Sequence, residues 1–128
     1  MRQSLLVLIL SLIFFISGQS AIAGSDPSNS VRTMATILYY LDHYPADSEK
    51  PKLEKIVGGG DSSNAEKIIA SAMLNLQHKA SNADKKKLST VMSDGSAPQS
   101  AKDLAKIVHD LNHKASSSDK AMLKKYMW

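Results

Sequence analysis

Apolar residues recur along the chain three and four positions apart, which is the spacing of an amphipathic helix with one buried face. Three segments share the same i, i+3, i+4, i+7 arrangement, formed by Met34, Ile37, Leu38 and Leu41, by Ile69, Ala72, Met73 and Leu76, and by Leu104, Ile107, Val108 and Leu111. A shorter apolar stripe follows each of them, beginning at Leu53, Leu88 and Leu123. No run alternates apolar and polar residues as a strand would. The pattern therefore predicts six helices and an all-α fold.

Residues that can cap a helix stand before each apolar stripe. They are Asp26, Asp47, Ser63, Ser81, Ser100 and Ser116. Each of the four serines is followed three positions later by an acidic residue, in the arrangement of a capping box. Gly58-Gly59-Gly60 and residues 93–96 then interrupt the pattern, because glycine and turn-forming residues end helices. Each pair of helices is therefore expected to form a helix–turn–helix hairpin.

These units repeat every 35 residues, a period that His43, His78 and His113 share. A fixed period of this kind marks an array of one supersecondary unit. We predict a single domain over residues 24–128. Its three helix–turn–helix hairpins, six helices in all, span about 26–57, 63–92 and 98–128. Short connections make neighbouring helices antiparallel, so we expect the hairpins to pack as one small bundle or a short solenoid.

The N-terminus has the composition of a secretory signal peptide, which we place at residues 1–23. Arg2 supplies positive charge, residues 5–16 are almost entirely apolar, and residues 21–23 form a small-x-small cleavage site. The apolar run is too short to span a bilayer, which needs about 20 residues. We therefore expect an exported mature protein, periplasmic or secreted, that does not span a membrane.

Composition narrows the functional classes. The chain has no cysteine, which excludes thiolate chemistry and iron–sulfur clusters. A formal net charge of +4 favours anionic partners only weakly, and lysines do not alternate with aromatic residues as on many nucleic-acid surfaces. No serine-centred elbow, glycine-rich phosphate loop or paired carboxylates are present. We therefore expect a binding protein that is not an enzyme, does not bind nucleic acid and needs no cofactor.

His43, His78 and His113 are the most conspicuous candidates for a function. On a continuous helix each falls in the last turn, where an imidazole can bond free carbonyl groups and complement the helix dipole. This structural role is the interpretation that the sequence favours. The alternative joins all three histidines on one metal ion, but stacked repeats hold equivalent residues along a ladder. Only a closed, near-threefold arrangement would bring them together.

A fourth histidine departs from the repeat. His109 stands where the other units have Tyr39 and Leu74, and it precedes His113 by four residues, which is about one helical turn. Two imidazoles with this spacing can bind Zn²⁺ or Cu²⁺. The glutamate of the His-Glu-x-x-His hydrolase motif is absent. A small metal-binding protein that uses His109 and His113 is therefore the alternative function.

Two tyrosines and two groups of lysines are candidates for contact with a partner. Tyr40 and Tyr44 occupy positions that are polar or charged in the other units, and an exposed tyrosine pair often anchors a protein partner. Packing against the N-terminal segment would cover the same pair instead. The lysines are Lys85, Lys86, Lys87, Lys124 and Lys125, which either gather into one basic face or form solvated helix surfaces. The sequence thus predicts a protein that binds another macromolecule, as an inhibitor or immunity-type protein or an accessory of an envelope machine.

Overall fold

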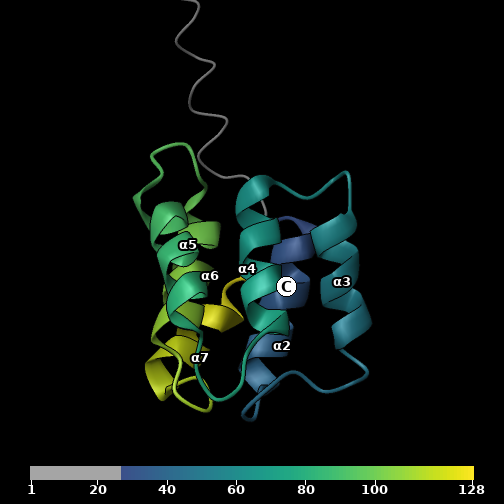
Figure 1. The fold of residues 1–128 in the computed structure, drawn as a ribbon, viewed down its shortest axis with the longest axis vertical. Helices are drawn as coiled ribbons and strands as arrows, with labels where there is room; N and C mark the ends of the chain where they lie inside the picture. Colours follow the sequence, from purple (N-terminus) through teal and green to yellow (C-terminus); the bar gives the residue numbers. More distant parts are fainter. Residues whose placement is uncertain (1–26) are drawn as a thin grey trace, which may run out of the picture.

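The computed structural model describes residues 27–128, and the signal peptide expected at residues 1–23 lies outside them. The described chain contains six helices and no strand (Figure 1). The helices are α2 (Asn29–Tyr40), α3 (Lys50–Gly58), α4 (Asn64–Leu74), α5 (Asn82–Ser93), α6 (Gln99–Asp110) and α7 (Ser117–Lys124). None of them is long and apolar enough to cross a membrane. The prediction of an all-α fold with six helices in one compact bundle is confirmed.

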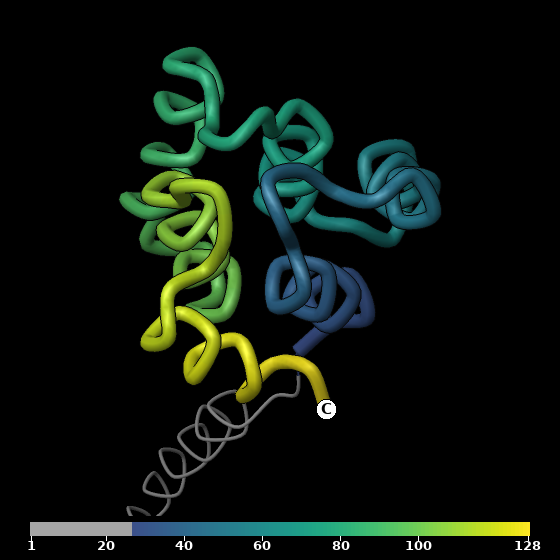
Figure 2. Tube along the Cα trace, turned by 90° about the horizontal axis from the view of Figure 1, so that it is seen from below, coloured from purple at the N-terminus to yellow at the C-terminus, as the bar shows by residue number. Residues whose placement is uncertain are grey.

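The helices are arranged in an inner and an outer layer. α2, α4 and α6 contact one another, and α3, α5 and α7 lie outside them (Figure 2). Each outer helix packs mainly on the inner helix of another hairpin: α3 on α4, α5 on α6, and α7 on α2. Because α7 returns to α2, the chain closes into a ring and does not extend as an open solenoid.

The apolar stripes fill the space between the two layers. Ala35, Ala70 and Ala105 are 0% exposed on the three inner helices, and their small side chains allow these helices to approach closely. From the outer helices, Leu53, Leu88 and Leu123 are also 0% exposed. The helical spacing in the sequence therefore identified the faces that form the core.

A serine side chain caps the N-terminus of four of the six described helices. Ser28, Ser63, Ser81 and Ser116 each accept a hydrogen bond from the backbone N–H three residues further on. The caps predicted at Ser63, Ser81 and Ser116 are thus confirmed, whereas Asp26 lies outside the described residues. The predictions of Asp47 and Ser100 are wrong, because Glu49 precedes α3 and Pro98 precedes α6. Asp47 instead accepts a hydrogen bond from the Lys50 ammonium group at 3.0 Å.

Among the described residues, two acidic side chains are buried where helices begin, and both have hydrogen-bond partners. Glu66 accepts hydrogen bonds from the Ser63 N–H at 3.0 Å and from the Ser28 hydroxyl at 2.7 Å, which joins the starts of α4 and α2. Asp84 accepts from the Ser81 hydroxyl at 3.1 Å and from the Asn75 amide at 3.3 Å. Since these partners satisfy the buried carboxylates, both acids have a structural role.

Tyr126 fastens the C-terminal segment to the bundle. Its hydroxyl donates a hydrogen bond to the Asp103 carboxylate on α6. Burial of the phenol and then this hydrogen bond raise the pKa of Tyr126 to about 12, from an ordinary value of 10.0. Because the folded state favours the neutral phenol, the contact contributes fully below pH 10.0 and is lost as the pH rises through about 12.

Candidate metal centre

The three inner helices end before the histidines that follow them. α2, α4 and α6 stop three or four residues short of His43, His78 and His113. The leucines in between, Leu41, Leu76 and Leu111, are buried in the core. The interpretation that each imidazole closes the last turn of a helix is therefore wrong, because the chain has left the helix before it reaches the histidine.

Each of these histidines has a left-handed backbone conformation. The φ angles are 74° at His43, 73° at His78 and 72° at His113, and no other non-glycine residue in the described chain has a positive φ. The Tyr44 N–H donates to the Asp42 carbonyl at 2.9 Å, and the Lys114 N–H donates to the Asn112 carbonyl at 2.9 Å. Such i to i+2 bonds around a central positive φ define the rarer and more strained form of the γ-turn. The chain thus holds a histidine in a costly conformation three times.

A closed ring of backbone hydrogen bonds joins the three turns. The His43 N–H donates to the His113 carbonyl at 2.7 Å, the His78 N–H to the His43 carbonyl at 3.0 Å, and the His113 N–H to the His78 carbonyl at 2.8 Å. Each histidine therefore donates to one neighbour and accepts from the other. This ring fixes the three Cα atoms around one axis at the carboxyl ends of the inner helices.

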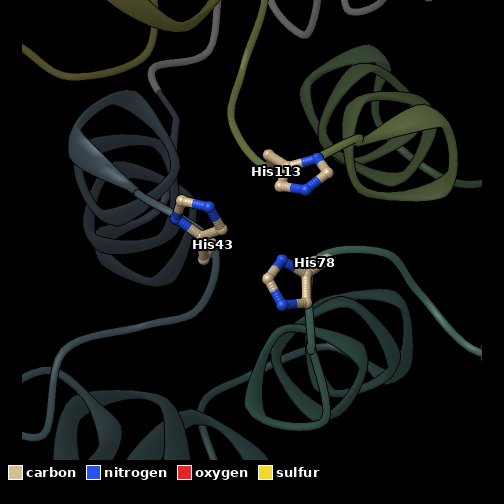
Figure 3. A group of neighbouring side chains, drawn as sticks. All are labelled: His43, His78 and His113. Atoms are coloured by element: carbon tan, nitrogen blue, oxygen red, sulfur yellow. The ribbon is translucent and has the colours of Figure 1, made fainter.

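The three imidazole rings converge on that axis (Figure 3). Ring centroids are 4.9 Å apart for His43 and His78, 5.0 Å for His43 and His113, and 4.8 Å for His78 and His113. One nitrogen from each ring lies within 4.8 Å of the other two. The expectation that equivalent histidines lie along a ladder is therefore wrong, because the units close into a ring.

Neighbouring side chains orient two of the three rings. The Nδ1 atom of His43 lies 2.7 Å from a carboxylate oxygen of Asp42, and Nδ1 of His113 lies 2.8 Å from the amide oxygen of Asn112. An oxygen acceptor at this distance favours a proton on Nδ1 and leaves Nε2 with its lone pair. Hydrogen bonds of this kind are the usual support of metal-binding histidines, since they set the tautomer and raise ligand basicity.

The surroundings of the cluster favour a cation. α2, α4 and α6 all direct their carboxyl ends towards it, and these ends carry the partial negative charge of the helix dipole. The Asp42 carboxylate adds a formal negative charge next to His43. His78 and His113 are exposed and His43 is half-buried, so an ion in solvent can reach the rings.

A metal ion needs only a modest rearrangement of these side chains. Zn–N bonds of about 2.0–2.1 Å in tetrahedral geometry place two ligand nitrogens about 3.4 Å apart. The nitrogens here lie within 4.8 Å of one another. Small rotations of the exposed imidazoles close this difference, while the ring of backbone hydrogen bonds stays in place.

His109 does not belong to the cluster. In the described part of the chain, the group close enough to share an ion consists of His43, His78 and His113. The predicted pairing of His109 with His113 assumed one continuous helix, but α6 ends at Asp110. The Nδ1 atom of His109 instead lies 2.7 Å from the Asp110 carboxylate. Hydrogen bonds from Lys106 and then from His109 lower the pKa of Asp110.

The tyrosines predicted to contact a partner lie on the surface. Tyr40 is 71% and Tyr44 is 56% exposed, and both border a hollow of about 360 Å³ that Asp42 and Pro45 also line. Since Tyr44 directly follows His43, this tyrosine pair adjoins the histidine cluster.

The predicted basic residues lie on two helices that do not touch. Lys85, Lys86 and Lys87 belong to α5, whereas Lys124 ends α7 and Lys125 follows it. α5 and α7 make no contact with each other. Lys124 also lies over the ring of Tyr39, 5.8 Å from its centroid.

Comparison with known proteins finds no match among protein-family models, curated proteins or solved structures. The function of the histidine cluster must therefore be inferred from its geometry and chemistry.

Proposed function

We propose that this protein binds a divalent transition-metal ion through one ring nitrogen each of His43, His78 and His113. The observation that carries this proposal is the convergence of three imidazoles, each of them on a left-handed backbone. Glycine and asparagine adopt that conformation more easily than histidine does. Packing supplies no reason for three exposed or half-exposed rings at such positions, whereas a metal ion that all three rings share supplies one.

The ligand set favours Zn²⁺, with Cu²⁺ as its main competitor. Three neutral imidazoles suit both ions, while the absence of thiolate and carboxylate ligands disfavours Cu⁺, Mg²⁺ and Ca²⁺. Three protein ligands leave the fourth position of a tetrahedral Zn²⁺ site open. The Asp42 carboxylate at His43 supports the charge of the ion from outside the ligand set.

An open position is compatible with holding, carrying or activating a ligand. A hydrolytic site also needs a general base, and Asp42 is already bonded to the Nδ1 atom of His43. We therefore propose a metal-binding protein that is not an enzyme. We further propose that it acts outside the cytoplasm, in line with the N-terminal signal predicted from the sequence.

Titration calorimetry with Zn²⁺ and Cu²⁺ tests the site directly. The mature protein, free of any added histidine tag, should bind one ion with a dissociation constant on the order of micromolar or tighter. His78→Asn should weaken binding roughly 100-fold or more because one of three ligands is lost. Asparagine tolerates a positive φ, so this variant should keep its fold.

His109→Asn is the matched control for that experiment. It removes a histidine outside the cluster, and it should bind the ion as tightly as the unmodified protein does. No saturable binding by the unmodified protein would end the proposal. Loss of binding in His109→Asn but not in His78→Asn would instead identify His109 and His113 as the metal ligands.

The exposed tyrosines support a second proposal, that the protein binds a protein partner. Tyr40 and Tyr44 are among the large apolar side chains that the described surface exposes, and such side chains commonly anchor interfaces. The hollow that they border gives a partner side chain a place to insert. A partner here would also contact the histidine cluster, because Tyr44 is adjacent to His43.

A pull-down from the envelope fraction tests this second proposal. The mature protein should retain a reproducible partner, and a Tyr40→Ser/Tyr44→Ser variant should lose it. A Lys86→Ser/Lys87→Ser variant changes the basic surface on α5 and leaves the tyrosines intact. It therefore tests whether the partner depends on the lysines or on the tyrosines. Equal retention by the tyrosine variant and the unmodified protein would exclude the tyrosine pair as the anchor.

A further inference from the structure

A second hollow shares a wall with the histidine cluster. It has a volume of about 340 Å³, and His78 lines it together with Tyr44, Lys50, Gln77 and an apolar wall that includes Leu74. His78 is a ligand of the proposed metal ion, so the hollow adjoins the ion through that ligand. Its volume lies at the lower end of the range of about 300–1,000 Å³ for small-molecule pockets.

The polar side chains that line this hollow are rich in hydrogen-bond donors. Lys50 offers an ammonium group, Tyr44 a hydroxyl and Gln77 an amide, and no acidic residue lines the hollow. Asp47 occupies one side of the Lys50 ammonium group at 3.0 Å, which leaves further N–H donors for a ligand. A metal ion held by three neutral imidazoles adds two positive charges beside them. The hollow therefore suits an anion.

Two more cations are adjacent in sequence to the histidines of the cluster. Lys79 directly follows His78 and Lys114 directly follows His113, and both lysines are exposed. The remaining histidine, His43, is followed by Tyr44, which lines the hollow. Every histidine of the cluster is therefore followed by a side chain that can donate a hydrogen bond to an anion.

We propose that the open coordination position of the metal ion takes the carboxylate group of a small ligand whose apolar body lies in this hollow. The inference rests on the proposed metal site. The carboxylate coordinates the ion and accepts hydrogen bonds from the donors of the hollow, while the apolar body contacts Leu74. A ligand of about ten non-hydrogen atoms fits such a volume.

The test uses Co²⁺ in place of Zn²⁺, because Co²⁺ reports its coordination in its visible spectrum. Benzoate added to the Co²⁺-loaded protein should change that spectrum with saturation. Benzamide, which has the same ring and no charge, should leave it unchanged. Acetate lacks the apolar body and should bind roughly tenfold more weakly than benzoate.

Two substitutions on α3 distinguish the contribution of a lysine that lines the hollow from the general effect of removing a positive charge. Lys50→Gln removes the cation that lines the hollow and should weaken benzoate binding about threefold to tenfold. Lys55→Gln removes an exposed cation from the same helix outside the hollow and should have no effect. Neither variant should change the affinity for Co²⁺.

The outcomes distinguish this inference from the proposed function. Failure of Co²⁺, Zn²⁺ and Cu²⁺ to bind would overturn the metal site and the inference with it. Metal binding without any response to benzoate would overturn the inference alone. An equal response to benzamide, or equal effects of the two lysine substitutions, would also overturn it.

Discussion

Replacing Leu76 by alanine should lower the free energy of unfolding by about 2–5 kcal/mol, the usual range for a core leucine. Leu76 is 2% exposed, and it lies between the end of α4 and His78. The inner helices contact one another and the outer helices close the ring around them, so a cavity at this position weakens the whole bundle. The loss is a large share of the roughly 5–15 kcal/mol that stabilises a small domain.

Urea unfolding followed by circular dichroism measures this loss. Leu76→Met conserves volume and apolar character, and it should cost less than about 1.5 kcal/mol. A single transition in all variants is expected, because no hairpin buries its own apolar stripe. A near-neutral Leu76→Ala would show that this leucine does not pack in the core.

The six helices and their buried faces could be predicted from sequence because both are local properties. Apolar residues three and four apart must share a helix face, and Met34 and Leu38 are indeed 0% exposed. Serine before an acidic residue in a capping box satisfies backbone N–H groups within one turn. Serine caps are present at Ser63, Ser81 and Ser116, and the complete box forms at Ser63 and Ser116.

The closure of the ring could not be predicted in the same way. Whether repeated units form a ladder or a ring depends on the angle between successive helices. That angle is set by packing of α3 on α4, of α5 on α6 and of α7 on α2, and helical spacing carries no information about it. A continuous helical pattern places each histidine at a helix end, and a ladder of stacked units keeps the three apart.

A sequence signal for the cluster nevertheless existed. Asp42, Gln77 and Asn112 directly precede the three histidines, and each carries a side-chain oxygen that can accept a hydrogen bond from an imidazole. Two of these bonds, at Asp42 and Asn112, are present. An acceptor beside every copy of a repeated histidine indicates a held tautomer, which a metal ligand needs and a helix cap does not.

Zn²⁺ should raise the free energy of unfolding by about 4 kcal/mol when free Zn²⁺ is about 1,000 times its dissociation constant. The three ligands are 35 residues apart in sequence, so the unfolded chain does not present them together. Thermal or urea unfolding with and without Zn²⁺ measures the gain, and a chelator should abolish it. An unfolding midpoint that Zn²⁺ does not move would mean that the ion binds no better to the folded than to the unfolded chain.

Glycine and alanine at position 78 should then reveal the strain in the turn. Both His78→Gly and His78→Ala remove a ligand and should lose the stabilisation by Zn²⁺. Without metal, His78→Gly should be more stable than His78→Ala by about 1 kcal/mol, because only glycine adopts a positive φ without a steric penalty. At an ordinary helix position the order is reversed, with glycine less stable than alanine by about 0.5–1 kcal/mol. If alanine were the more stable variant here, the left-handed conformation at 73° would carry no cost. A metal ion would then not be needed to offset a strained backbone at this position.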